Sequence, residues 1–208
     1  MKITYLGHAS FLIESKDGDI VFDPYLNDSV PGLVFPKGIC ADACFCSHNH
    51  DDHVAKEYVK INAAPKKINY SLFKIPHDKS GGAKRGMNNI CSCSLEGKRI
   101  VHLGDIGVID KQVLSNIKNC DVVLVPINGF FTISAKEAKE LFDYVQPKLI
   151  IPMHYEIKDR GIGYPDGGQI DIFKQLFPNN LKVKKSSIIL GDYLDKTNSI
   201  IFEEIYKN

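Results

Sequence analysis

Short apolar runs separated by turn residues recur along most of the chain. They are rich in Val, Ile, Leu, Phe and Tyr, and Gly, Pro, Asn or Asp stand between many of them. Runs of this kind predict β-strands. The expected strands are KITYL (2–6), SFLIES (10–15), DIVFDP (19–24), ADACFCS (41–47), KINYSLFKI (67–75), NICSCSLE (89–96), KRIVHLGD (98–105), CDVVLVP (120–126), KLIIPMH (148–154), SIILGDYL (187–194) and SIIFEEIY (199–206).

Four other segments have the spacing of amphipathic helices: 52–61, 110–118, 134–145 and 166–177. The third has the clearest signals, because Ser134 and Glu137 form a capping box and Pro147 follows its end. No linker rich in Ser, Pro or Gly divides the chain. We therefore expect an α/β protein with one domain over residues 1–208, in which helices cover the sheets.

Charge and hydropathy restrict the partners. The 208 residues include 26 basic and 25 acidic side chains, a formal net charge of +1. This balance gives no reason to expect nucleic acid or an anionic membrane surface as a partner. The longest apolar runs are far shorter than the roughly 20 residues that a membrane span needs, and the start of the chain lacks the apolar core of a signal peptide. We expect a cytoplasmic protein that has no membrane partner.

Six cysteines lie at 40, 44, 46, 91, 93 and 120. No CxxC pair is present. Cys44 and Cys46 lie two positions apart inside one expected strand, and Cys91 and Cys93 lie two positions apart inside another. We interpret them as reduced structural thiols, since small apolar side chains suit a buried strand face.

The string CSHNHDDH at 46–53 places three imidazoles and two carboxylates in six consecutive positions, 48–53. It follows the expected strand 41–47 and precedes the expected helix 52–61, so its side chains can converge on a turn. Imidazole nitrogen and carboxylate oxygen are ligands that zinc accepts. His48 and His50 can bind one ion, while Asp52 and His53 point elsewhere and suit a second. The alternative is a solvated polar loop, but the density of the cluster favours metal.

One turn cannot complete two coordination shells. Further donors close other apolar runs where a loop begins: Asp23, His77, Asp105 and His154. Five of the seven histidines would then be ligands, and the other two are His8 and His102.

These motifs resemble the metallo-beta-lactamase superfamily over roughly residues 1–155. The matching features are the early strand-ending Asp23, the H-x-H-x-D-H turn, His77, Gly104-Asp105 and His154. More narrowly, LGHASFLIE, VFDPY, Arg85-Gly86-Met87-Asn88, HLGD and IPMHY look like the small stand-alone hydrolases of this superfamily, a group that includes the ascorbate-phosphate lactonase.

The resemblance implies a four-layer αββα sandwich of two mixed sheets flanked by helices, with the site along one edge. His48, His50 and His77 would hold the first metal, Asp52, His53 and His154 the second, and Asp105 would bridge them. Asp23 would hydrogen-bond a ligating imidazole and fix its tautomer. His102 is an alternative to His77 as the third histidine, although its place within a strand favours a packing role.

The implied reaction is hydrolysis. Two divalent ions, zinc in the first place and manganese or iron as alternatives, would lower the pKa of a shared water and polarise the electrophile. Counting Asp52, Asp105 and a bridging hydroxide against the ions leaves the site about one charge positive. We therefore expect a small anionic substrate, such as a lactone, amide or phosphoester, in a pocket under the loop 161–168.

Other residues are candidates for proton transfer and substrate contact. His8 and Tyr155 could protonate the leaving group or touch the substrate, and Lys84 and Arg85 could pair with its anion. The alternatives are packing roles for the first two and a solvated basic loop for the others. The catalytic set is then Asp52, Asp105 and His8, with Lys84, Arg85 and Tyr155 at the substrate.

Three other functions compete with this hypothesis. An RNA-cleaving phosphodiesterase would need a basic phosphate-tracking surface, which the net charge does not favour. A di-iron redox protein of this fold usually has Glu where this chain has Asn49. A metal-binding sensor without turnover and a homo-oligomeric state are both left open by the sequence.

Overall fold

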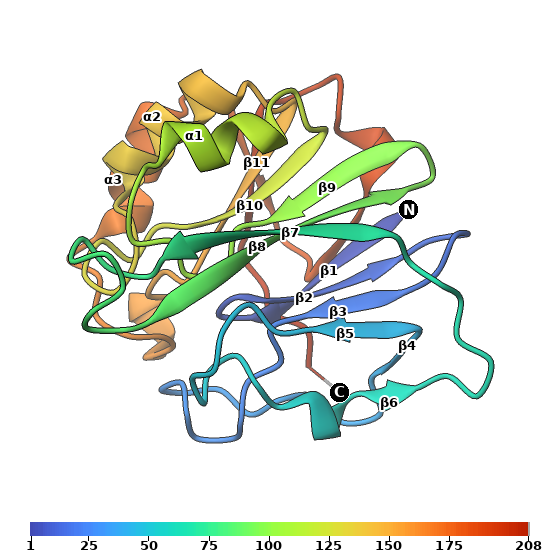
Figure 1. Cartoon of the computed structure of the whole chain (residues 1–208). Coiled ribbons are helices and arrows are strands. Elements are labelled where there is room, and N and C mark those ends of the chain that lie inside the picture. Colours follow the sequence, from blue (N-terminus) through green and yellow to red (C-terminus); the bar gives the residue numbers. More distant parts are fainter. Residues whose placement is uncertain (208) are drawn as a thin grey trace.

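The computed structural model describes residues 1–207, and most of the strands form two mixed sheets (Figure 1). The seven-stranded sheet has the order β12-β14-β11-β10-β9-β8-β7, and the five-stranded sheet has the order β13-β1-β2-β3-β5. The strands of the larger sheet are β7 (Tyr70–Pro76), β8 (Met87–Leu95), β9 (Lys98–His102), β10 (Val122–Pro126), β11 (Leu149–Met153), β12 (Asn180–Val183) and β14 (Ser199–Phe202). Those of the smaller sheet are β1 (Lys2–Gly7), β2 (Ser10–Glu14), β3 (Ile20–Phe22), β5 (Ala43–Phe45) and β13 (Ser187–Ile189).

The central strands β10 and β11 of the larger sheet are buried on both faces. Along β10, Val122 and Leu124 join a core that contains the five-stranded sheet, whereas Val123 and Val125 join a second core that contains the helices. Successive side chains of a strand point to opposite faces, and a strand covered on both faces is a continuous apolar run. The run VVLV therefore supplies both cores.

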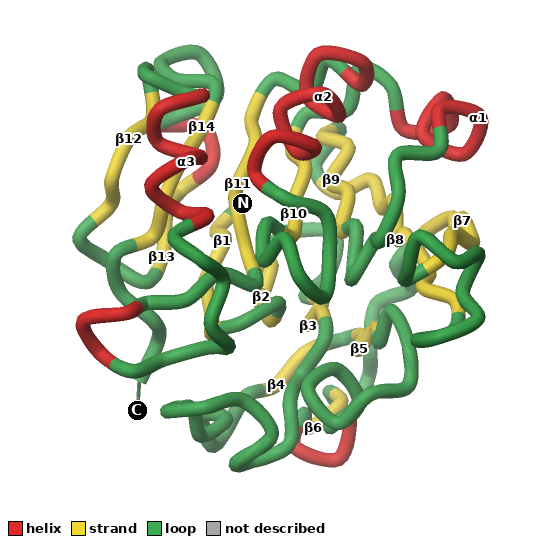
Figure 2. The backbone as a smooth tube through the Cα atoms, turned by 90° about the vertical axis from the view of Figure 1, so that its left-hand side faces the viewer, coloured by secondary structure: helices red, strands yellow, loops and turns green. Residues whose placement is uncertain are grey.

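Three helices cover the outer face of the larger sheet: α1 (Lys111–Leu114), α2 (Ala135–Val145) and α3 (Gln169–Leu176). They gather on one side of the molecule in both views (Figures 1 and 2). In α2, Ser134 accepts from the Glu137 amide and Glu137 accepts from the Ser134 amide, and Gln146 ends the helix in a left-handed conformation. The capping box and the three helices predicted at 110–118, 134–145 and 166–177 are confirmed, although the first and last are shorter than predicted.

The helix predicted over 52–61 is wrong. Residues 48–55 form a loop, followed by a 3-10 turn (Lys56–Tyr58) and the short strand β6 (Lys60–Ile61). Ala55 donates to the Pro24 carbonyl and Lys60 donates to the Ile39 carbonyl, so the backbone is bound to neighbouring segments where a helix would need its own bonds. Tertiary contacts override the helical spacing here.

The sequence-based fold class, α/β with two packed mixed sheets, is confirmed. Beside the five-stranded sheet, the segment 25–39 contributes Tyr25 and Phe35 to the core, and the region around β4 (Cys40–Ala41) and β6 consists mainly of loops (Figure 2). Within residues 1–207, no helix is long and apolar enough to cross a bilayer.

Candidate metal centre

The predicted metal ligands, together with Asp23 and the candidate proton-transfer residue His8, lie on loops that follow strands. His8 follows β1, Asp23 follows β3, the cluster 48–53 follows β5, His77 follows β7, Asp105 follows β9 and His154 follows β11. These loops meet at one end of the two sheets. The structure therefore brings the side chains singled out at strand ends into one cluster.

The first group consists of His48, His50 and His77, each of which offers a nitrogen within 4.8 Å of the others. His48 Nε2 and His50 Nδ1 lie 3.0 Å apart. The His77 ring centroid lies 4.6 Å from that of His48 and 5.1 Å from that of His50. Three imidazoles thus face one small volume.

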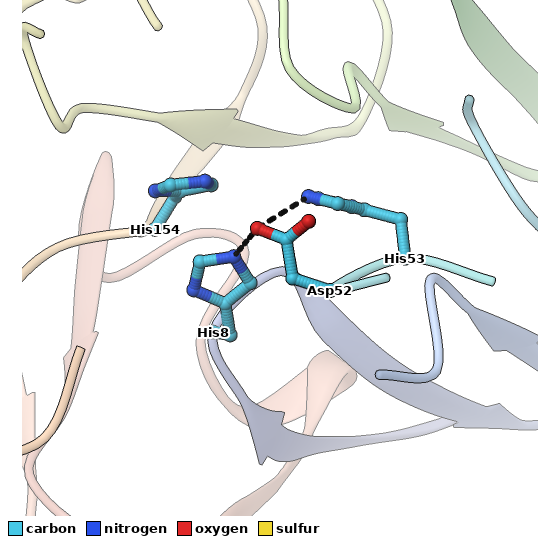
Figure 3. Close-up of side chains that lie close together, drawn as sticks. All are labelled: His8, Asp52, His53 and His154. Atoms are coloured by element: carbon cyan, nitrogen blue, oxygen red, sulfur yellow. Dashed lines mark hydrogen bonds and ion pairs between the residues drawn. The ribbon is translucent and has the colours of Figure 1, made fainter. Parts of the chain in front are cut away.

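The second group consists of His8, Asp52, His53 and His154 (Figure 3), whose donor atoms also lie within 4.8 Å of one another. Asp52 Oδ2 lies 3.1 Å from His8 Nε2 and 3.5 Å from His53 Nε2. The ring centroids of His8 and His154 are 3.9 Å apart. This group mixes one carboxylate with three imidazoles.

Asp105 lies between the two groups. Its Oδ2 is 3.0 Å from His154 Nε2, 3.3 Å from His53 Nε2 and 3.6 Å from His77 Nε2. Burial opposes its charge, but His154 and His53 outweigh burial and hold the pKa of the Asp105 carboxyl well below its usual range. A carboxylate at this position touches ligand candidates of both groups.

Asn88 and Gly104 fix the backbone beside Asp105. The Asp105 amide donates to Asn88 Oδ1 at 2.8 Å, while the Asn88 amide group donates to the Leu103 carbonyl. Gly104 has a φ of +55°, and a Cβ there would lie 2.2 Å from Asn88 Oδ1. Only glycine fits this close approach. Asn88 stood in a motif of the sequence, but its role depends on a long-range contact that the sequence alone did not reveal.

Asp23 orients two histidines. Its carboxylate accepts from the Ser47 amide and hydroxyl, both at 2.6 Å, and lies 2.8 Å from His53 Nδ1. His53 therefore donates through Nδ1 and directs Nε2 at Asp105. Because the single Ser47 hydroxyl proton is given to Asp23, Ser47 Oγ accepts from His48 Nδ1 at 2.9 Å. The lone pair on His48 Nε2 then points toward His50.

The backbone is strained at three of these positions. His8, Asp23 and His154 have φ values of 55°, 42° and 60°, in the left-handed region that non-glycine residues rarely adopt. The His154 amide and the Tyr5 hydroxyl both donate to the His8 carbonyl at 3.0 Å. Such strain persists where surrounding contacts hold it, and it concentrates at functional sites.

His102 does not join the cluster. Its Nε2 lies 2.8 Å from the Ala9 carbonyl, its Nδ1 accepts from the Gly104 amide, and its ring stacks on Phe22 with centroids 4.9 Å apart. Both nitrogens are thus bonded to backbone groups. Of the two alternatives for the third histidine, the structure places His77 in the cluster.

Burial favours the neutral form of three of these imidazoles. It lowers the pKa of His8 to about 4 and that of His48 to about 3, and the pKa of His77 also falls. His53 differs, because the carboxylates of Asp105, Asp52 and Asp23 outweigh burial and raise its pKa. Neutral imidazole is the form that binds metal.

A pocket of about 320 Å³ opens over the cluster. It is lined by His50, Asp52, His77, Arg85, Asp105, Phe131, His154 and Tyr164. Arg85 was among the predicted substrate contacts, and Tyr164 comes from the loop 161–168 that was expected above the site. Phe131 was missed, although the pair Phe130-Phe131 after an expected strand was a signal for an exposed aromatic turn.

Two predicted substrate contacts need correction. Tyr155 is buried, stacks on Tyr5 and donates its hydroxyl to the Phe202 carbonyl, so its side chain is a packing group outside the pocket. Lys84 is exposed, and its side chain does not line the pocket. Neighbouring residues of a loop point in different directions, and here only Arg85 faces inward.

Two packed mixed sheets with a His and Asp cluster at the strand ends define the metallo-beta-lactamase class of fold and site. Residues 2–154 match the model of the beta-lactamase superfamily domain. This chain belongs to that superfamily.

The descriptions of similar proteins agree with this family membership. The UPF0173 metal-dependent hydrolase of Carboxydothermus hydrogenoformans is 32% identical over 74% of this chain and 84% of its own length, and that of Archaeoglobus fulgidus is 31% identical over 74% and 83%. A crystal structure from Thermotoga maritima, described as a Zn-dependent hydrolase of the metallo-beta-lactamase superfamily, is 29% identical with a TM-score of 0.71 and covers 97% of each chain.

Proposed function

We propose that this protein, a metal-dependent hydrolase of the superfamily, binds two divalent cations and cleaves a small anionic lactone, amide or phosphoester. The observation that carries the proposal is the convergence of imidazole and carboxylate donors from separate loops within 4.8 Å of one another in each group. Buried polar groups otherwise pair with one another or with water.

Two observations on this chain favour cations at the centre. His53 Nε2 and Asp105 Oδ1 are buried without a hydrogen-bond partner among residues 1–207. His48 Nε2 and His50 Nδ1 face each other at 3.0 Å, a geometry that suits two lone pairs directed at one ion. Nitrogen and oxygen donors without thiolate fit zinc and manganese.

The residues divide into two sites with a shared carboxylate. His48, His50 and His77 would hold one ion, Asp52, His53 and His154 the other, and Asp105 would touch both. Zinc is the first candidate because the Thermotoga maritima relative is described as Zn-dependent. Bound ions of this kind lower the pKa of water to near 7 and polarise the electrophile.

The chain's own residues supply orientation and proton transfer. Asp23 keeps His53 in one tautomer, and Asn88 holds the backbone of Asp105. Asp52 lies 3.1 Å from His8 Nε2 at the wall of the site, so this pair could take up the proton that the attacking water releases and pass it to the leaving group. Arg85, on the pocket wall, would attract the negative charge of the substrate.

A compact pocket favours a small molecule over RNA. The volume of about 320 Å³ lies at the lower end of small-ligand sites. The formal net charge of +1 provides little attraction for a polyanion.

The test is to reconstitute the purified protein with zinc, manganese or iron, measure bound metal, and assay a lactone panel, a generic phosphodiester and a short RNA. Turnover of a small substrate with zinc or manganese is expected. Iron with a visible absorption band and no hydrolysis would favour a redox protein. Bound metal without turnover of any substrate would favour a binding protein, and RNA cleavage alone would favour the nuclease.

A further inference from the structure

One wall of the pocket is aromatic and leads outward from the candidate metal ligands. The Tyr164 ring stacks near His154 with centroids 6.3 Å apart, and the Phe131 ring lies 5.3 Å from Tyr164. Phe130 lies 4.9 Å from Phe131 and is 74% exposed. The rings are inclined to one another, by 60° between Phe131 and Tyr164 and by 87° between Phe130 and Phe131, so separate aromatic faces lead from the candidate metal ligands to solvent.

Arg85 lies on this wall. Its guanidinium carbon is 4.6 Å from the Phe131 ring centroid and 5.7 Å from that of Phe130. Within residues 1–207 its side chain has no hydrogen bond or ion pair to an acceptor. Stacking fixes the plane of a guanidinium but leaves the N–H donors at its edge free, and those donors match a carboxylate or phosphate.

The loop that carries Arg85 is organised by one carboxylate. Asp78 accepts from the backbone amides of Ser80, Gly82, Lys84 and Arg85, at 2.7 to 3.2 Å. Asp78 directly follows His77. The loop that carries the Arg85 side chain is therefore held by the same turn that carries His77, a candidate metal ligand, before any substrate binds.

The aromatic pair is equally fixed. Asn128 Oδ1 accepts from the amides of Phe130 and Phe131, at 3.2 and 3.1 Å. Phe130 is exposed and contacts Phe131 and Arg85 rather than the core, so aromatic surface and a cation lie together beside the pocket.

We propose that the substrate combines a hydrolysable group with a planar unsaturated ring and a second, anionic group. The ring lies against Phe131 and Tyr164, and the anion pairs with Arg85. This inference rests on the proposed function, because it places the hydrolysable group at the metal centre. Aromatic contacts select a flat ring, and the Arg85 fork selects a carboxylate or phosphate.

Binding of non-hydrolysable phosphonates to the zinc-loaded protein tests the inference without turnover. Calorimetry would compare phenylphosphonate with cyclohexylphosphonate, which differ in flatness, and with para-carboxyphenylphosphonate, which adds the anion. We expect phenylphosphonate to bind roughly threefold or more tighter than cyclohexylphosphonate. The added carboxylate should improve affinity by roughly tenfold.

Variants assign each preference to its residue. Arg85→Met should abolish the advantage of the carboxylate and keep the preference for the flat ring. Phe131→Leu should abolish the preference for the flat ring and also reduce the carboxylate advantage, because the Phe131 ring holds the Arg85 guanidinium. Phe130→Ser, at an exposed position on which folding does not depend, should reduce the carboxylate advantage in part. Lys118→Met is the matched control, because Lys118 lies 4.1 Å over the Tyr144 ring, a cation–π pair that does not line the pocket.

The outcomes separate the two proposals. If zinc and the phosphonates bind but the wild type prefers neither the flat ring nor the carboxylate, this inference is overturned and the metal centre stands. The same holds if the carboxylate advantage survives in Arg85→Met and the preference for the flat ring survives in Phe131→Leu. A protein that takes up no metal and binds no phosphonate would overturn both proposals.

Discussion

The two donor groups of the candidate metal centre are held in different ways. In the second group, carboxylates contact the imidazoles directly, with Asp52 beside His8 and Asp105 beside His154. In the first group, His48 and His50 face each other at 3.0 Å, while Asp105 lies 3.6 Å from His77 and within 4.8 Å of His48. In the second group, carboxylates of the protein can balance the charge of the imidazoles. In the first group, two imidazole nitrogens face each other.

The two groups should therefore respond differently to a bound cation. Imidazolium and carboxylate attract each other whether or not metal is present. Two imidazole lone pairs at 3.0 Å repel unless a proton or a cation lies between them. We therefore infer that a cation matters most to the geometry of His48, His50 and His77, and that Asp105 couples the two groups.

The largest expected effect comes from breaking that coupling. Asp105→Ala should remove at least one metal and reduce turnover by at least about a hundredfold, since even the loss of a hydrogen-bond partner to a ligand costs metal affinity 10- to 100-fold. Metal analysis and kinetics on the folded variant would measure this. Asp121→Ala is a suitable control, because Asp121 pairs with Lys148 outside the site. Full metal retention in Asp105→Ala would contradict its bridging position.

A paired substitution separates ligand from packing histidine. His77→Ala should lose one metal per chain with little change in the stability of the metal-free protein. His102→Ala should keep both metals but lose about 2 kcal/mol or more of unfolding free energy, because it removes a stacked ring and two buried hydrogen bonds. Metal analysis and urea unfolding give the two readouts. The opposite pattern would make His102 the ligand.

A smaller effect is expected at Asp23. Asp23→Asn keeps the shape of the side chain but removes the charge that orients His53, so metal affinity should fall roughly 10- to 100-fold. Competition with a chelator would measure the change. Asp42→Asn is a matched control, since Asp42 also accepts a backbone amide, that of Asp19, but lies outside the site. Equal affinities in wild type and Asp23→Asn would exclude the orienting role.

The smallest effect concerns the metal-free protein and pH. Burial places the folded pKa of His8 at about 4 and that of His48 at about 3, below the ordinary value of 6.5. At pH values between 6.5 and these folded pKa values, the unfolded chain binds more protons than the folded chain, so the unfolding free energy should fall as pH drops from about 6.5 to 4. His53 opposes this, because its raised pKa adds stability below pH 6.5 that is lost as pH rises through the folded value.

Urea unfolding with chelator at pH 7 and pH 5 would measure the balance. We expect lower stability at pH 5, because more histidines have a lowered pKa than a raised one. The pKa is lowered at His8, His48, His77 and His102 and raised at His53. A metal-free protein that is more stable at pH 5 would show that His53 and its carboxylates dominate instead.

Local sequence signals predicted most of the fold. Apolar runs gave the strands, and the capping box at Ser134 and Glu137 gave the start of α2. The helix predicted at 52–61 failed because the Ala55 amide bonds to the distant Pro24 carbonyl. Spacing along the chain carries no information on such long-range partners.

The clustering of the candidate donor side chains was predictable from their positions in the sequence. Histidine and aspartate at strand ends meet wherever neighbouring strands end together, so residue type and position were enough. Tyr155 and Tyr164 show the limit. Tyr155 directly follows His154, and Tyr164 lies further along the same loop region. Only the fold decides that Tyr155 packs on Tyr5 while Tyr164 faces the pocket.

The most direct test of the account is a crystal structure of the zinc-loaded protein with an anomalous difference map at the zinc edge. We predict two peaks roughly 3.5 to 4 Å apart, one among His48, His50 and His77 and the other among Asp52, His53 and His154. Asp105 should touch both. A single peak, or peaks away from these side chains at full zinc occupancy, would contradict the paired centre.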